Sequence, residues 1–139
     1  MTTPQLLMTT SASIIGLLGL AHLVLTYHGP KLLPRDRTLQ QAMRGSAPVI
    51  TTQTTIWEMW IGFNVSHSMG AMLFGLVYGY LAQAHPQILF QSIFLQTTGL
   101  LMLAGFTTLA YRYWFITPLL GSAVALLCYV AALVVAALL

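Results

Sequence analysis

The amino-acid sequence predicts an all-α integral membrane protein, a bundle of four membrane-spanning helices forming one domain over residues 1–139. Two composition figures and one pattern lead to this class. Of the 139 residues, 58% are hydrophobic and only 5% are charged. Soluble domains carry about 25% charged residues, and disordered chains are poor in apolar residues. The pattern is a series of apolar runs, each long enough to cross the hydrocarbon core of a bilayer.

The four predicted spans are separated by one long polar loop and two short breaks. They cover residues 8–27, 54–84, 88–111 and 114–139. The first is interpreted as a retained helix, because no Lys or Arg precedes it as in a signal peptide. The second ends at Pro86, since proline cannot continue a helix. The third ends at Arg112, and Pro118 lies in the first turns of the fourth, where proline is tolerated.

The basic residues predict the orientation. Four cations, Lys31, Arg35, Arg37 and Arg44, lie in the loop between the first two spans, and Arg112 lies on the same side. The opposite side has no Lys or Arg, so the positive-inside rule predicts a cytoplasmic loop with both termini outside (N-out/C-out). The apolar residues among the loop cations leave two possibilities open: a short amphipathic helix on anionic headgroups, or a plain basic loop.

Several functional classes are disfavoured by what the chain lacks. Its one cysteine, Cys128, excludes an intramolecular disulfide and a CxxC metal site. Asp36 and Glu58 are the only carboxylates, and no nucleophile elbow, phosphate loop or HExxH motif is present. The net charge of +3 is explained by topology signals, so nucleic acid is not an expected partner.

Polar residues inside the second span mark its inward face, because such groups normally avoid lipid. At 100° per residue, one stripe contains Trp57, Trp60, Asn64, His67, Ala71, Phe74 and Tyr78. Asn64 and His67 are neighbours on it, so the amide could orient the imidazole. Glu58 lies on the opposite face. Glycines such as Gly75 and Gly79, in small-xxx-small spacing, indicate close helix packing.

Two candidate sites follow from the predicted depths. His22, Glu58 and Arg112 lie near the cytoplasmic ends of three spans, where they form either a charge cluster that joins the helices or a headgroup, anion or proton site. His67 lies deeper and either hydrogen-bonds to a neighbouring helix or binds haem iron or another metal. The spans place His67 about 6–12 Å deeper than His22, which argues against both histidines ligating one haem.

The stretch 55–70, with its W-x-x-W-x-G-F-N-x-S-H-S pattern, resembles a family of small, uncharacterised four-helix proteins of the bacterial inner membrane. Residues 20–22 (Leu-Ala-His) and 113–118 (Tyr-Trp-Phe-Ile-Thr-Pro) are similar to the same proteins, so the resemblance covers nearly the whole chain. It implies the four-span architecture and the inner-membrane location, and no activity. The size also matches the trimeric eicosanoid and glutathione enzymes, but no arginine lies between Arg44 and Arg112 to bind glutathione.

Three functional hypotheses remain open. The chain is an accessory, assembly or interaction subunit with a polar intramembrane site, whose partners are membrane lipids and either other membrane subunits or further copies of itself. Alternatively, it is a redox protein that binds haem or a metal through His67, His22 or both. The third hypothesis is a small lipid-modifying enzyme or transporter that uses Glu58, His22 and Arg112.

Overall fold

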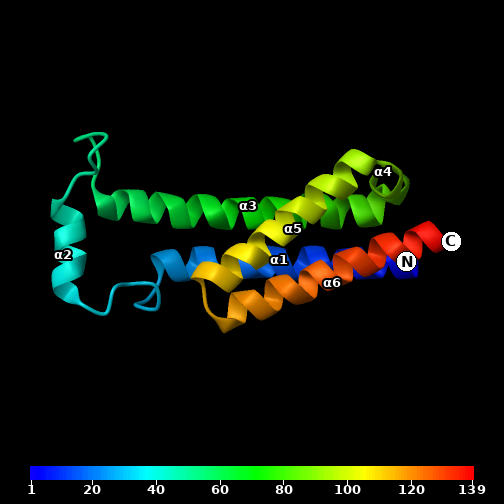
Figure 1. Ribbon diagram of the computed structural model, residues 1–139, viewed down its shortest axis with the longest axis horizontal. Helices are drawn as coiled ribbons and strands as arrows, with labels where there is room; N and C mark the ends of the chain where they lie inside the picture. The colour runs from blue at the N-terminus through cyan, green and yellow to red at the C-terminus, as the bar shows by residue number, and fades with distance from the viewer. The chain divides into compact units, whose positions relative to one another are not determined.

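The computed structural model describes residues 1–139 and is entirely helical, which confirms the all-α prediction (Figure 1). Its six helices, in chain order, are α1 (Thr3–Tyr27), α2 (Arg37–Gly45), α3 (Ile56–Ala84), α4 (Pro86–Gln91), α5 (Ile93–Tyr113) and α6 (Ile116–Leu138). Helices suit a membrane chain because they satisfy their own backbone hydrogen bonds.

Three of these helices, α1, α5 and α6, are long and apolar enough to cross a membrane. The composition of the helices is therefore that of a multi-pass membrane protein. Helix α3, with 29 residues, is the longest but is not among the three. Its first half carries Asn64, Ser66, His67 and Ser68, which lower its apolar character.

The chain divides into two compact units. The core unit comprises residues 1–18 and 71–139, and the loop unit comprises residues 19–70. Helices α1 and α3 are each divided between the two units. Helices α4, α5 and α6 belong to the core unit alone, and α2 belongs to the loop unit alone.

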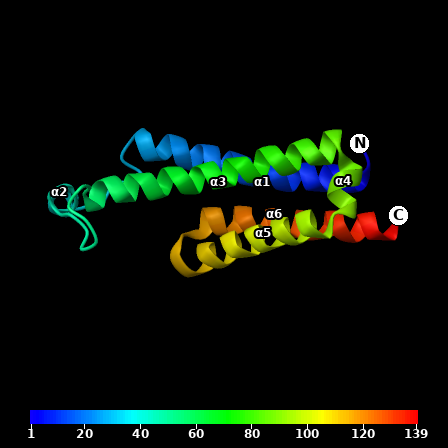
Figure 2. The same ribbon diagram turned by 90° about the horizontal axis from the view of Figure 1, so that it is seen from above.

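In the core unit, α5 and α6 pack against each other as a helical hairpin (Figure 2). The turn between them, at Trp114 and Phe115, has extended backbone angles. The buried core consists of small, aliphatic and aromatic side chains from all five helical segments of the unit: Met8, Ala12, Ile15, Ala71, Phe74, Tyr78, Ala82, Leu89, Leu103, Ala125, Tyr129 and Ala132. The presence of Ala71, Phe74 and Tyr78 in this set confirms the predicted inward stripe for this half of α3.

Glycines allow the closest contacts of the core unit. A Cβ atom on Gly75 of α3 would lie 2.8 Å from both the backbone oxygen of Ala12 and the Cα atom of Gly16 in α1. The two backbones are therefore in direct contact, which confirms the packing role predicted for Gly75. Nearby, the Ser11 hydroxyl donates a hydrogen bond to the Ala125 carbonyl oxygen at 2.7 Å, joining α1 to α6.

Two buried tyrosines join the remaining helices. The Tyr78 hydroxyl donates to the Leu95 carbonyl oxygen at 2.7 Å, and the Tyr129 hydroxyl donates to the Gln96 carbonyl oxygen at 3.0 Å. These carbonyls lie in the first turn of α5, where Gly99 leaves the necessary space: a Cβ atom there would lie 2.7 Å from the rings of both tyrosines. No local pattern in the sequence predicts these two bonds, because they join residues far apart in the chain.

The predicted third span, residues 88–111, is wrong in one respect. The chain forms two helices here, α4 and α5, separated at Ser92, whose backbone is extended. The Ser92 hydroxyl accepts a hydrogen bond from the Leu95 amide and so caps α5. The Gln96 side chain closes the break by donating to the Phe90 carbonyl oxygen at 2.7 Å. Helix α1 also begins earlier than predicted, at Thr3.

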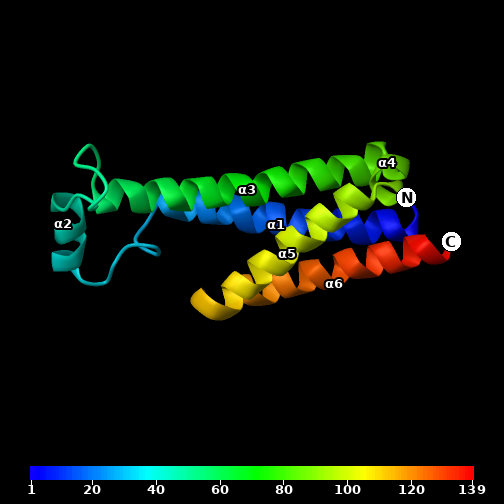
Figure 3. The same cartoon turned by 45° about the horizontal axis from the view of Figure 1, so that its top comes forward.

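The loop unit consists of the end of α1, the short helix α2 and the first half of α3. Of the two possibilities left open for the basic loop, a short amphipathic helix forms, and its contact with lipid headgroups stays a prediction. Asp36 caps it by accepting a hydrogen bond from the Thr38 amide at 2.8 Å. Within this unit, α2 lies crosswise to the segments of α1 and α3 that it connects (Figures 1 and 3).

Candidate functional site

The loop unit brings together two of the predicted site residues, His22 of α1 and Asn64 of α3. The Nε2 atom of His22 lies 2.8 Å from the Asn64 amide oxygen. The Asn64 amide nitrogen donates to the Trp60 carbonyl oxygen at 2.7 Å, one turn earlier in α3. Because the amide nitrogen is used as a donor, its oxygen is the acceptor, and Nε2 of His22 carries the proton. In the neutral ring, Nδ1 is then an unprotonated nitrogen.

His67 packs against the same histidine. The ring centroids of His22 and His67 are 5.4 Å apart, with the ring planes at 83°, so one ring presents its edge to the other. Both rings are half-buried. We call His22, Asn64 and His67 the histidine cluster. The Asn64 amide oxygen contacts the histidine of α1, and the expectation that Asn64 orients His67 on its own helix stays a prediction.

The expectation that His67 lies much deeper than His22 is wrong. That estimate assumed that the first helix ends at the level where the second begins. His22 lies about one and a half turns before the end of α1, whereas His67 lies about three turns after the start of α3. For the two rings to touch, α3 must begin roughly one and a half turns beyond the end of α1. The relative level of two helix ends is set by tertiary packing, which spacing along the chain does not reveal.

Neighbouring hydroxyls support the cluster without entering it. Thr26 donates to the His22 carbonyl oxygen at 2.8 Å, and Ser68 donates to the Asn64 carbonyl oxygen at 2.9 Å. Both side chains are buried. Each hydroxyl thus donates its hydrogen bond within its own helix, so neither competes with His22 for the Asn64 amide.

The cluster does not fit a haem between its two histidines. Bis-histidine ligation places the porphyrin between the rings, but here the edge of one ring rests on the face of the other. In addition, Nε2 of His22 already faces the Asn64 oxygen. A metal ion would find two imidazoles but no third protein ligand, since no group of three or more His, Cys, Asp or Glu side chains could hold one. Zinc sites use three or four protein ligands.

Glu58 forms a capping box with Thr55 at the N-terminus of α3. Its carboxylate accepts hydrogen bonds from the Thr55 amide at 2.8 Å and the Thr54 hydroxyl at 3.1 Å, while the Glu58 amide donates to the Thr55 hydroxyl at 3.2 Å. This reciprocal pattern satisfies two backbone donors that a helix N-terminus otherwise leaves free. The spacing of Thr55 and Glu58 in the sequence is the signature of this box, and it would have predicted this role. The carboxylate is exposed.

Arg112, the third member of the predicted cytoplasmic set, lies in the last turn of α5. A cation there interacts favourably with the negative end of the helix dipole. Arg112 belongs to the core unit, whereas His22 and Glu58 belong to the loop unit. Their association as one site remains a prediction.

A second contact of the loop unit was not predicted. The Arg44 guanidinium, at the end of α2, lies 4.4 Å from the centroid of the Trp57 ring in the first turn of α3. Trp57 in turn stacks on Trp60, with ring centroids 5.2 Å apart. Such cation–π contacts are worth about 0.5–1 kcal/mol at exposed sites. The tryptophan pair was visible in the sequence, but its cationic partner lies across a loop.

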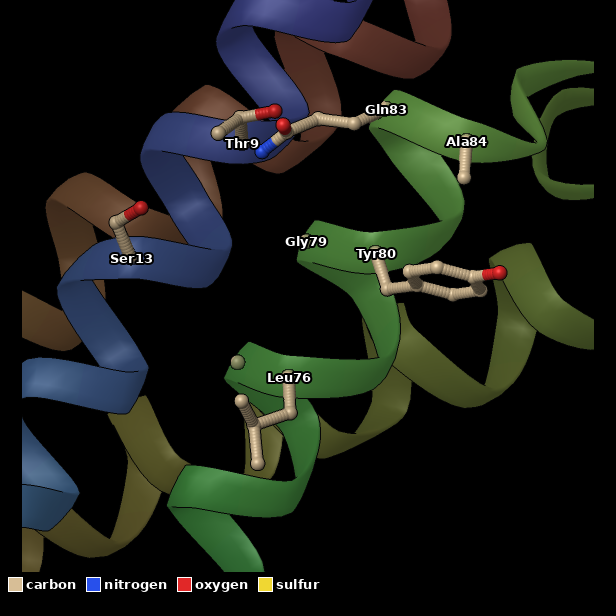
Figure 4. A pocket seen from close by; sticks show the side chains of 8 residues that line it. Thr9, Ser13, Leu76, Gly79, Tyr80, Gln83 and Ala84 are labelled. Atoms are coloured by element: carbon tan, nitrogen blue, oxygen red, sulfur yellow. The ribbon is translucent and has the colours of Figure 1, made fainter.

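The core unit has a shallow, open pocket of about 580 Å³ between α1 and α3 (Figure 4). Its lining residues are Thr9, Ser13, Gly75, Leu76, Gly79, Tyr80, Gln83 and Ala84. Figure 4 shows Gln83 extending from α3 toward Thr9 of α1. The Thr9 hydroxyl is buried and has no hydrogen-bond partner.

The fold and its helix composition define the class of the protein: an all-helical, multi-pass membrane protein. Comparison with known proteins finds no matching family model, no matching curated protein and no matching solved structure.

Proposed function

We propose that the chain spans the bacterial inner membrane four times. In this proposal α3 is a span in addition to α1, α5 and α6, and both termini lie outside. Helix α3 is about 44 Å long, which exceeds the roughly 30 Å hydrocarbon core. Its polar side chains Asn64 and His67 are half-buried against the protein, whereas Phe63 and Leu73 are largely exposed. This division supports a helix that shows its apolar face to lipid and turns its polar face inward.

Within that membrane, the function we propose is that of a non-enzymatic interaction or assembly subunit. The observation that carries this proposal is that the strongest polar groups inside the helices bind one another: His22 binds Asn64, and Asn64 binds the Trp60 carbonyl. Such bonds hold helices together.

The outward surface supports the same proposal. Large apolar side chains are exposed on every long helix, including Leu17, Phe63, Leu73, Leu101 and Leu127. Lipid covers part of such a surface, and in this proposal another membrane subunit covers the rest.

Site-specific photo-crosslinking in native membranes tests this proposal. A crosslinking residue at Leu101, which is 68% exposed on α5, should capture one defined membrane protein. The matched control is Leu103 on the same helix, which is fully buried and should give no adduct with another chain. Purification in mild detergent should recover the same partner. Adducts with lipid alone, together with an isolated homo-oligomer after purification, would contradict the assembly role.

A second candidate function, metal binding in a redox protein, is favoured by one observation: the contact between the rings of His22 and His67. A small rotation of the rings could direct two imidazole nitrogens at one ion, with water completing its coordination. Titration of the purified protein with Cu²⁺, a redox-active ion that imidazole ligands suit, should then show one site per chain, lost in both His22→Ala and His67→Ala. Binding that persists in both variants would place the metal elsewhere.

The third hypothesis, a lipid-modifying enzyme or transporter, receives less support from the contacts. It requires Glu58 and His22 to act together with Arg112. The Glu58 carboxylate caps α3 through Thr54 and Thr55, and the His22 ring faces Asn64. Each of these two groups therefore has a structural partner that the proposed chemistry would have to displace.

A further inference from the structure

Helix α2 is strongly amphipathic for its length. At 100° per residue, Leu39, Ala42 and Met43 share one face, at the i, i+3 and i+4 positions. Arg37 and Arg44 lie on the opposite face, together with two glutamines. This arrangement of an apolar stripe opposite cations is typical of helices that lie in the interface of a membrane.

The protein itself does not cover the apolar stripe of α2. None of the nine residues of this helix is buried, and the Leu39 side chain is 51% exposed. Helices shorter than about 12–15 residues are marginal in water unless packing against another surface stabilises them. Farther along the same loop, Val49 and Ile50 are also exposed. The loop therefore presents an apolar surface that needs a covering partner.

The position of α2 restricts what that partner can be. Ten residues or so separate it from the end of α1 at Tyr27 and from the start of α3 at Ile56, so it is tethered close to both. It lies crosswise to these two segments (Figures 1 and 3). A helix crosswise to a membrane-spanning segment lies along the membrane surface.

The charges of the loop indicate which kind of membrane surface α2 binds. Between residues 31 and 45 there are four cations, Lys31, Arg35, Arg37 and Arg44, and one anion, Asp36. The Arg44 guanidinium rests on Trp57, which fixes the end of α2 against the first turn of α3. Tryptophan is enriched at the level of the lipid headgroups. The cations and the aromatic ring thus mark the same interfacial layer.

From these observations we infer that α2 is a membrane-surface helix that binds the anionic phospholipid headgroups of the leaflet from which α1 and α3 emerge. Its stripe of Leu39, Ala42 and Met43 enters the boundary between headgroups and acyl chains, and Arg37 and Arg44 remain at the phosphates. The inference depends on the multi-pass membrane class and not on the interaction-subunit role, so the two can fail separately.

The test uses the full-length protein with Cys128→Ser and a single new cysteine that carries a polarity-sensitive fluorophore. Leu39→Cys reports on the apolar stripe, and Gln41→Cys on the opposite face of α2 is the matched control. The protein is reconstituted in vesicles of phosphatidylcholine alone or with phosphatidylglycerol added. Quenching of each label by spin-labelled lipids of either headgroup is measured.

The expected result is strong lipid quenching at position 39 and weak quenching at position 41. Spin-labelled phosphatidylglycerol should quench position 39 more than spin-labelled phosphatidylcholine does, and Arg37→Gln should reduce this preference by up to about fivefold. Added salt should reduce it as well. Equal, weak quenching at both positions would overturn the inference. So would shielding at position 39 that grows with the protein-to-lipid ratio and not with anionic lipid, because it would identify a second copy as the partner.

Discussion

The same two helices, α1 and α3, are joined by different interactions in the two units. In the core unit their backbones touch, because Gly75 leaves no side chain between them and Gly16. In the loop unit the contact runs through side chains, His22 to Asn64 and His22 to His67. Backbone contact tolerates no added volume. A side-chain hydrogen bond can be lost while the helices stay close to their places.

This difference matters because lipid gives helices no hydrophobic reason to associate. Van der Waals packing of small residues and interhelical hydrogen bonds are the two available sources of stability. Between α1 and α3, the chain uses the first source in the core unit, at Gly75, and the second in the loop unit, between His22 and Asn64. We therefore expect substitutions in the core unit to be the more damaging.

The largest effect is expected for Gly75→Ala. The added Cβ atom would lie 2.8 Å from backbone atoms of Ala12 and Gly16, which cannot move aside as a flexible side chain could. Overpacking of this kind costs about 1–3 kcal/mol. The free energy of unfolding in detergent, measured by thermal or denaturant unfolding, should fall by that amount.

The matched control is Gly62→Ala, on the same helix α3. A Cβ atom at Gly62 meets nothing within 4 Å, so this variant should be neutral or stabilised by up to about 1 kcal/mol, the helix propensity gained over glycine. Equal effects of the two substitutions would show that the backbone contact is not the source of stability in the core unit.

A smaller effect is expected in the loop unit from removal of the His22–Asn64 bond. A double-mutant cycle with His22→Ala and Asn64→Ala isolates their coupling energy, because each single variant removes the same bond. Hydrogen bonds between membrane helices average about 0.6 kcal/mol, with a maximum near 1.7 kcal/mol. The coupling should fall in this range when unfolding free energies are compared in the same detergent.

Ser66→Ala provides the reference for that cycle. The Ser66 hydroxyl is exposed and donates to the Phe63 carbonyl oxygen of its own helix. Paired with His22→Ala, it should show no coupling. A coupling near zero for His22 with Asn64 as well would mean that packing, not the polar bond, joins the helices in this unit.

Local patterns in the sequence predicted those parts of the fold that depend on one helix at a time. Composition predicted an all-α membrane chain, and helical periodicity predicted the stripe whose members Ala71, Phe74 and Tyr78 are buried. The break at Ser92 was missed because no Pro or Gly marks it. A serine three residues before Leu95 is a weak capping signal within an apolar run.

The candidate site was predicted less well, because it depends on how two helices are aligned. His22, Asn64 and His67 were each singled out by polarity within an apolar run. Their contact was not foreseen, since the level at which α3 begins relative to α1 follows from packing. The Thr55–Glu58 capping box, by contrast, has a local signature in the sequence, a threonine followed three residues later by a glutamate.

The smallest effect on stability is expected from lowering the pH. This effect should appear in the loop unit and not in the core unit. Hydrogen bonds from the Thr38 hydroxyl and amide lower the pKa of Asp36 below its ordinary value of 3.8. A carboxylate with a lowered pKa stabilises the folded form fully above its unfolded value, and this contribution disappears as the pH falls through the lowered pKa. Acidification from about pH 5 toward pH 2 should therefore loosen α2 at its first turn, while the core unit, held by apolar packing and tyrosine hydroxyls, keeps its structure.

The NMR amide shift of Thr38 in detergent micelles measures this loosening, with the Gly99 amide as the reference in the core unit. Asp36→Asn should remove the pH response of α2, because asparagine caps a helix without titrating. The same acid response in this variant would assign the transition to another group. A change in the Gly99 amide shift over the same pH range as the Thr38 change would show instead that the two units unfold together. The glycine packing of the core unit and the polar side-chain contacts of the loop unit would then not stabilise the two units separately.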